Sequence, residues 1–127
     1  SLMNGTRIEV RDLFYATPAR LKFLKTDRTE IQQAIDIVSR LAMSHPEISF
    51  SLISDGKQML MLDSAQGNLL DSRLQRLGKL MGRGFSDNAL ALQHSREGMS
   101  LSGFAALPTY NRGTSSEQYL FVNGRPV

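Results

Sequence analysis

The segment DLFYATPARLKFLK, Asp12 to Lys25, carries the clearest local signals near the start of the chain. Three large apolar residues, Leu13-Phe14-Tyr15, precede a proline that fixes its own φ and biases Thr17 toward extended geometry. A corner is therefore expected at Pro18. The basic residues that follow it are Arg20, Lys22 and Lys25. Either this is a strand–helix joint with a solvated basic side, or the basic side faces a partner.

The residues before the corner alternate as in a half-buried strand. Apolar Ile8 and Val10 are interleaved with charged side chains. We expect a strand from Thr6 to Asp12 and, after the corner, a short helical turn from Ala19 to Lys25.

An amphipathic helix is indicated next. Thr29 to Gln32 matches a capping box with Thr29 at the N-cap. Pro46 ends the helix, because proline lacks the N–H that a helix interior needs. The apolar positions recur at helical spacing: Ile31, Ala34, Ile35, Val38, Leu41 and Ala42.

Two hairpins are expected after this helix. In the first, Ile48 to Leu52 alternates, Asp55-Gly56 gives a turn signal, and Lys57 to Asp63 is the return strand. The second joins strands Ala89 to His94 and Met99 to Ala106.

A second helix is expected between the hairpins, from Leu69 to Met81, ended by Gly82 and Gly84. Its apolar face is expected to hold Leu70, Leu74, Leu77 and Met81. By helical angle, a solvated basic face opposite it is expected to hold Arg73, Arg76, Lys79 and Arg83.

The end of the chain reads as a polar loop, Leu107 to Gln118, and a strand, Tyr119 to Val122. Asn123-Gly124 is another hairpin signal, but the sequence stops before a return strand of ordinary length. We therefore expect a fragment of a longer chain.

Composition narrows the class of protein. The 127 residues fit a single domain, 1–127, with one core. Cysteine is absent, which excludes disulfides and thiolate metal sites and fits a reducing cytosol. No apolar run approaches the roughly 18 residues of a membrane helix. The net charge of +3 is compatible with a polyanionic partner.

Catalytic signals are missing. His45 and His94 lie far apart, without carboxylates at metal-ligand spacing, so no metal site is expected. The sequence has no G-x-S-x-G elbow. Gly82-Arg83-Gly84 lacks the lysine and hydroxyl residue of a phosphate loop. Because no acid, base and nucleophile assemble, this fragment is not expected to be an enzyme.

Two segments resemble the MutL mismatch-repair family. GTRIEVRDLFYATPARLKFLK, Gly5 to Lys25, is similar to the signature G-T-x-V-x-V-x-x-L-F-Y-N-T-P-A-R-x-K-F-L, and YLFVNGRPV, Tyr119 to Val127, is similar to its F-V-N-G-R segment. Residues 26–118 are similar only in their pattern of helices and strands. The resemblance implies the second, transducer domain of the N-terminal half. Its fold is α/β (α+β), ribosomal protein S5 domain 2-like, with a mixed sheet and helices on one face.

The resemblance also implies a function in DNA mismatch repair. The domain would couple the ATP state of an upstream GHKL ATPase domain to dimer closure and to DNA binding without sequence specificity. The fragment would hold no cofactor, because the lysine that reaches the γ-phosphate lies beyond Val127, while the parent ATPase would bind ATP and magnesium. An endonuclease region elsewhere in the parent is left open.

Several partners are implied in the same way: duplex or single-stranded DNA, a mismatch-recognition protein, the upstream ATPase domain and a second copy of the parent. No membrane partner is expected. The parent would be cytoplasmic and associated with the nucleoid.

Site residues follow from the matched motifs. Lys25 falls at a basic position implicated in DNA binding, and the role is extended to Arg20, Lys22 and Arg125. The conformational joint is expected at Phe14, Tyr15, Thr17 and Pro18. Two positions depart from the motif: Ala16 replaces the usual asparagine and Leu21 a frequent basic residue.

Two alternatives stay open at this point. One is an S5-like transducer domain of another GHKL ATPase, such as a type II topoisomerase. The other is a protein-interaction module that binds a mismatch-recognition protein and makes no DNA contact.

Overall fold

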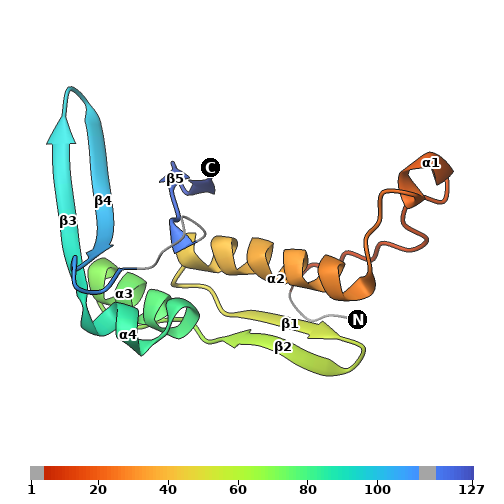
Figure 1. Cartoon of the computed structure of the whole chain (residues 1–127), viewed down its shortest axis with the longest axis horizontal. Coiled ribbons are helices and arrows are strands. Elements are labelled where there is room, and N and C mark those ends of the chain that lie inside the picture. Colours follow the sequence, from red (N-terminus) through yellow and green to blue (C-terminus); the bar gives the residue numbers. More distant parts are fainter. Residues whose placement is uncertain (1–4, 112–116) are drawn as a thin grey trace.

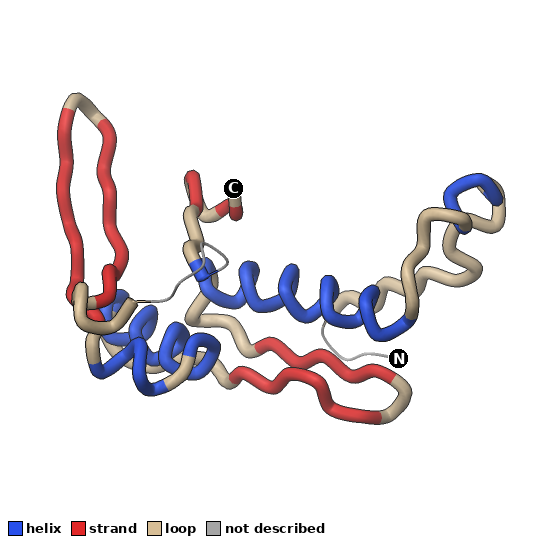
Figure 2. Tube along the Cα trace, in the orientation of Figure 1, coloured by secondary structure: helices blue, strands red, loops and turns tan. Residues whose placement is uncertain are grey.

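The computed structural model describes residues 5–111 and 117–127. Its longest element is helix α2, Asp27–Ser44, which lies along a hairpin made by β1, Phe50–Ser54, and β2, Lys57–Leu62 (Figure 1). Two parts project from this centre: the N-terminal arm, residues 5–26, and a second hairpin at the other end (Figure 2). The arrangement is open, and its best-packed region is where α2, the first hairpin and α3 meet.

Helix α2 begins one turn earlier than the capping box predicted. Its N-cap is Thr26, whose Oγ1 accepts a hydrogen bond from the Thr29 backbone N–H at 3.4 Å. The carboxylate of Glu30 reaches back to the Lys25 backbone N–H at 2.7 Å. The prediction of Thr29 as the cap is wrong, because Thr26 and Glu30 together satisfy donors at an earlier start.

The rest of the α2 prediction is confirmed. The helix ends at Ser44, and the N–H of His45 still donates to the Leu41 carbonyl before Pro46. Most of the predicted apolar stripe is half-buried, Ala42 is fully buried, and Leu41 is exposed.

The first hairpin forms around the predicted turn, although its first strand is Phe50–Ser54 where Ile48 to Leu52 was expected. Its two turn residues, Asp55 and Gly56, both have positive φ, 49° and 73°, as in the tight turns that match strand twist. Phe50 pairs with Leu62 and Leu52 with Leu60, so these apolar side chains share one face. Both strands contact α2, and Leu62 at the end of β2 is buried.

Helix α3 has the predicted bounds, Leu69–Met81, and Gly82 at φ 92° ends it. Its predicted basic face is wrong in one respect: Arg76 is 1% exposed and lies in the interior with Ser72. Leu70, on the predicted apolar face, is 40% exposed. Arg76 faces the interior because it donates hydrogen bonds to backbone carbonyls there. The pattern of apolar residues along α3 gives no information about those carbonyls.

The second hairpin is also confirmed, with β3 at Ala89–Arg96 and β4 at Met99–Ala106. It follows the short helix α4, Arg83–Asp87, and projects away from α2 (Figure 1). The Arg73 side chain ties it to α3, since Nη1 donates to Oγ of Ser102 at 3.1 Å.

The chain closes with a third, very short hairpin of β5, Phe121–Val122, and β6, Arg125–Pro126. The return strand that the sequence did not predict is therefore present, although it is two residues long. Asn123 and Gly124 form the turn at φ 50° and 78°. The predicted strand from Tyr119 is shortened at its start. The predicted polar loop falls partly outside the described residues.

The predicted strand from Thr6 to Asp12 is not formed. Ile8 and Val10 are 84% and 73% exposed, and no strand of the described residues pairs with this segment. An extended chain becomes a strand only when a neighbour takes up its N–H and C=O groups. After the corner, a helical turn does form as α1, Pro18–Leu21, but it ends at Leu21 and does not reach Lys25 as predicted.

The α/β class is confirmed. Among the described residues, the strands form three separate two-stranded antiparallel sheets, whereas one mixed sheet was expected. The chain runs through α3 and α4 between the first two hairpins, which keeps their edges apart (Figure 1).

Candidate functional site

The predicted conformational joint is a run of tight turns. Asp12 and Phe14 have positive φ, 49° and 68°, a region that residues other than glycine rarely occupy. The N–H of Tyr15 donates to the Asp12 carbonyl, and the N–H of Thr17 donates to the Phe14 carbonyl, both at 2.9 Å. Backbone strain of this kind is often concentrated at segments that change conformation.

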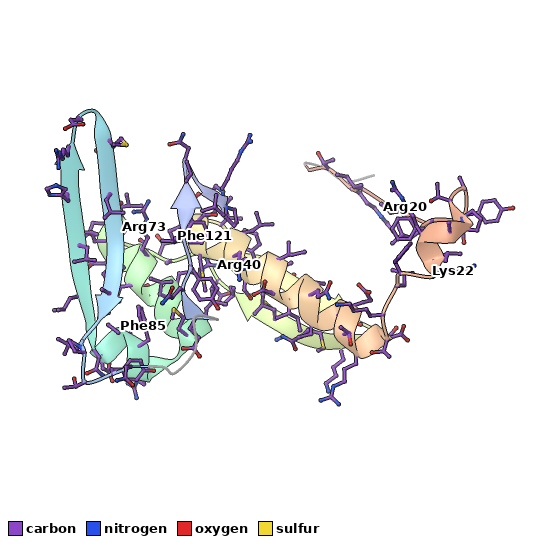
Figure 3. All side chains as sticks on the ribbon, turned by 45° about the horizontal axis from the view of Figure 1, so that its top comes forward. Arg20, Lys22, Arg40, Arg73, Phe85 and Phe121 are labelled. Atoms are coloured by element: carbon purple, nitrogen blue, oxygen red, sulfur yellow. The ribbon has the colours of Figure 1, made fainter. Side chains whose placement is uncertain are left out.

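The corner at Pro18 carries the first basic group into solvent. Pro18 begins α1, and the Arg20 N–H donates to the Thr17 carbonyl at 2.8 Å. Arg20 and Lys22 are exposed on this turn, well away from the end of α2 (Figure 3). Lys25 is exposed directly before the N-cap of α2. Among the residues that the structure describes, none of these three cations forms an ion pair.

Arg125 lies near the opposite end of α2. Its hairpin sits beside the C-terminal part of that helix, and β6 contacts it (Figure 1). A helix of 18 residues is about 27 Å long. The four predicted DNA-binding residues therefore form two groups: Arg20, Lys22 and Lys25 lie on the arm that leads into α2, and Arg125 lies beside the opposite end of that helix.

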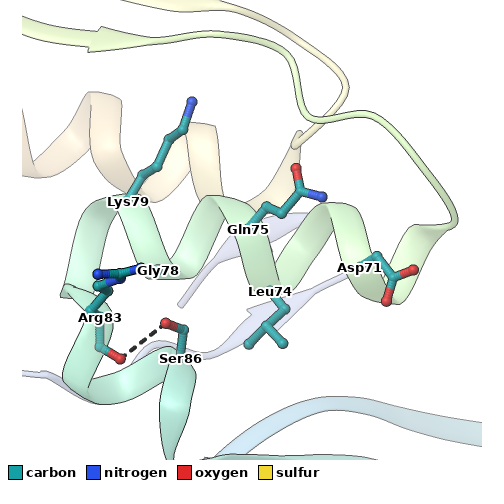
Figure 4. A pocket seen from close by; sticks show the side chains of 7 residues that line it. All are labelled: Asp71, Leu74, Gln75, Gly78, Lys79, Arg83 and Ser86. Carbon is teal, nitrogen blue, oxygen red and sulfur yellow. Dashed lines mark hydrogen bonds between the residues drawn. The ribbon is translucent and has the colours of Figure 1, made fainter.

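The predicted basic face of α3 is divided among three environments. Arg76 is buried, Arg73 binds the second hairpin, and Lys79 stands 4.0 Å from the Asp63 carboxylate. Lys79 and Arg83 line an open groove between α3 and α4 (Figure 4). The other residues that line this groove are Asp71, Leu74, Gln75, Gly78 and Ser86. Because Asp71 also lines it, the groove is not a purely cationic surface.

One contact was missed by the sequence reading. The guanidinium carbon of Arg40 lies 4.9 Å from the centre of the Tyr119 ring, and Nε of Arg40 donates to Oδ2 of Asp36 at 2.9 Å. The hydrogen bond to Asp36 is the main cause that raises the pKa of Arg40. The i, i+4 spacing of Asp36 and Arg40 could have predicted the ion pair. Nothing local could have predicted Tyr119.

The histidines and carboxylates of the described residues do not form a metal site. Residues 5–111 and 117–127 contain no group of three side chains placed to hold a metal ion. Nδ1 of His45 is 3.2 Å from Oε1 of Glu47, and His94 is exposed on the second hairpin. No helix in these residues has the length and apolar character to cross a membrane.

Comparison with known proteins explains the two motifs. Residues 77–127 match the family described as DNA mismatch repair protein, C-terminal domain. The chain is 63% identical to the DNA mismatch repair protein MutL of Rhodospirillum rubrum over 97% of its length. It is 58% identical to MutL of Phenylobacterium zucineum over 98% of its length and 47% identical to MutL of Rickettsia bellii over 97%.

The chain belongs to the MutL family. It spans about a fifth of the length of these relatives, 20% in each case. Among solved structures it is similar to the Aquifex aeolicus MutL ATPase domain complexed with ADP, with a TM-score of 0.68 and 29% identity. That match covers 93% of this chain and 42% of the solved chain.

Membership in the MutL family removes the alternative of a type II topoisomerase. The match to the family description begins inside α3, so α2 and the first hairpin precede it. The prediction of one domain over residues 1–127 stays a prediction.

Proposed function

We propose that this MutL segment acts in DNA mismatch repair as a transducer, which couples the nucleotide state of an ATPase domain to dimer closure and to DNA binding without sequence specificity. The observation that carries the proposal is its place within MutL proteins, in a stretch that is similar to a solved MutL ATPase domain. Residues 77–127, which match the family described as DNA mismatch repair protein, C-terminal domain, lie within the proposed transducer.

The proposed DNA surface consists of Arg20, Lys22 and Lys25 on the arm that leads into α2 and of Arg125 beside the opposite end of that helix. All four side chains are exposed. Positioned Lys and Arg side chains are sufficient to bind phosphates, and they confer no sequence preference. Helix α2, which is about 27 Å long, lies between the two groups.

The remaining parts of the proposal concern the whole protein. ATP and magnesium would bind outside this segment, and the strained joint around Phe14 would transmit the change. A second copy and a mismatch-recognition protein would be partners. The parent would work in the cytoplasm at the nucleoid.

A fluorescence anisotropy titration tests the DNA surface. The full-length protein is titrated against a labelled duplex over a series of salt concentrations, with and without an ATP analogue. We expect Lys22→Glu/Lys25→Glu to weaken binding to all sequences and to reduce the salt slope by about 2, one for each lost phosphate contact.

A matched control keeps the same change in net charge. Lys57→Glu/Arg96→Glu reverses two exposed cations at the turns of the first and second hairpins, where no DNA contact is proposed. An equal loss in both double variants would mean that only overall charge matters, and the site would be rejected. DNA binding that is insensitive to the ATP analogue would reject the transducer role. No DNA binding even at low salt, with retained binding of a mismatch-recognition protein, would favour the interaction module.

A further inference from the structure

The hairpin that carries Arg125 is too short to fix its own direction. It runs from Leu120 to Val127, with two residues in each strand, and is closed by the Val127 N–H, which donates to the Leu120 carbonyl at 3.0 Å. Isolated two-stranded hairpins are at best marginally stable in water. Its orientation must therefore come from what it rests on, which is α2.

The pairing within this hairpin decides which way Arg125 points. Phe121 pairs with Pro126, and Val122 pairs with Arg125. Paired residues share a face, and successive residues alternate between faces. Phe121 and Pro126 are half-buried, whereas Val122 and Arg125 are exposed. When the first pair is held against the molecule, the second pair is turned to solvent.

Arg40 of α2 makes a contact at the base of the hairpin. Tyr119 immediately precedes the hairpin, and its ring lies 4.9 Å from the guanidinium carbon of Arg40. Asp36, one turn back on α2, fixes the guanidinium through the 2.9 Å hydrogen bond to Nε. Because the hydrogen bond to Asp36 already orders the Arg40 guanidinium, stacking that guanidinium on the Tyr119 ring costs little further side-chain entropy.

We infer that Tyr119 and Arg40 are positioning residues for Arg125: their contact docks the Leu120–Val127 hairpin on α2 and so presents Arg125 to a DNA phosphate. The inference rests on the proposed function, since it assigns a cause to the direction of a proposed DNA contact. Neither residue needs to touch DNA.

A charge-neutral variant separates positioning from electrostatic attraction. Tyr119→Leu removes the ring and leaves the net charge unchanged, so a general loss of attraction to DNA is not expected. In the full-length protein we expect it to weaken binding to a labelled duplex by a factor of about 3 to 10 and to reduce the salt slope by about 1. Tyr119→Phe keeps the ring and should restore most of the affinity.

A double-mutant cycle with Arg125→Ala gives the decisive reading. If Tyr119 acts through Arg125, then Tyr119→Leu adds no further loss once Arg125 is alanine. Arg40→Lys is the second route, since it keeps the charge but loses the flat face; we expect a smaller loss that also vanishes in the Arg125→Ala background. Circular dichroism identifies any variant that fails to fold, and the other variant then carries the test.

The outcomes are distinguishable. If Arg125→Ala alone leaves affinity and salt slope unchanged, the DNA contact proposed at Arg125 is wrong. If Arg125→Ala weakens binding but Tyr119→Leu does not, the inference is overturned and the proposed contact stands. The inference is also overturned if Tyr119→Leu causes its full loss in the Arg125→Ala background.

Discussion

Nη2 of Arg76 donates to the backbone carbonyl of Ile48 at 2.6 Å, and this bond joins α3 to the segment that leads into β1. The same nitrogen also reaches the carbonyls of Pro46 at 2.9 Å and Asp63 at 3.0 Å. The guanidinium stands over the Phe50 ring, 5.7 Å from its centre. Burial lowers the pKa of Arg76, because removing the guanidinium from water disfavours its charged form. The hydrogen bonds to three backbone carbonyls offset this cost.

The stability of Arg76 variants should depend more on whether the new side chain donates hydrogen bonds than on its shape. Nε and Nη1 of Arg76 are buried without a partner in the described residues, so only the Nη2 bonds need to be replaced. We expect Arg76→Met to lower the free energy of unfolding by about 3 kcal/mol, because it leaves buried carbonyls unpaired. Arg76→Lys, whose ammonium has three donors, should lose less than half as much. Urea denaturation of the full-length protein measures both, and equal losses would contradict this account.

The start of α2 should depend on Thr26 and much less on Thr29. Oγ1 of Thr26 accepts the Thr29 N–H, so Thr26→Ala should cost about 1 kcal/mol. Thr29→Ala leaves that acceptor in place and should change stability by less than about 0.5 kcal/mol. Hydrogen exchange of the first turn of α2 measures the local effect. The capping-box pattern predicted the reverse order, and a larger effect of Thr29→Ala would restore it.

The turn of the second hairpin should require glycine. Gly98 has φ 80°, and a Cβ at this position would meet no atom within 4 Å, so Gly98→Ala is opposed by backbone strain alone. We expect it to destabilise the hairpin by about 1 kcal/mol. Gly103→Ala on β4 is the control, since its φ is not positive and its surroundings are open. It should be neutral or stabilise slightly, because alanine loses less chain entropy on folding. Faster amide exchange in both variants would argue against this explanation.

The carboxylate of Glu47 should contribute to the pH dependence of stability. A hydrogen bond to its own backbone is the main cause that lowers its pKa below the ordinary value of 4.5, and the hydrogen bond with His45 acts in the same direction. A lowered pKa in the folded state favours folding above the unfolded pKa, and this contribution is lost as pH falls through the folded pKa. Glu47→Gln should therefore flatten the acid limb of stability. NMR titration of the Glu47 carboxyl carbon measures this pKa directly. An ordinary pKa would contradict the proposed effect of these hydrogen bonds.

The sequence by itself determined the local elements. Helical apolar spacing with Pro46 behind it placed the end of α2, and Leu69 to Met81 was predicted with the bounds that α3 has. Asp55-Gly56 predicted the first hairpin, because residues that accept positive φ fix a tight turn without help from the rest of the chain. The two motifs at Gly5–Lys25 and Tyr119–Val127 predicted the family.

The tertiary structure alone decided which faces are buried and which side chains meet. Arg76 was expected in solvent because its helical angle is close to that of Arg73, yet distant carbonyls turn it inward. The strand expected at Ile8 and Val10 has the right alternation but lacks a neighbour in the described chain. Arg125 and Lys25 lie toward opposite ends of α2, because the β5–β6 hairpin contacts that helix. Turns and helix periods are local, whereas burial and pairing depend on residues that are remote in sequence.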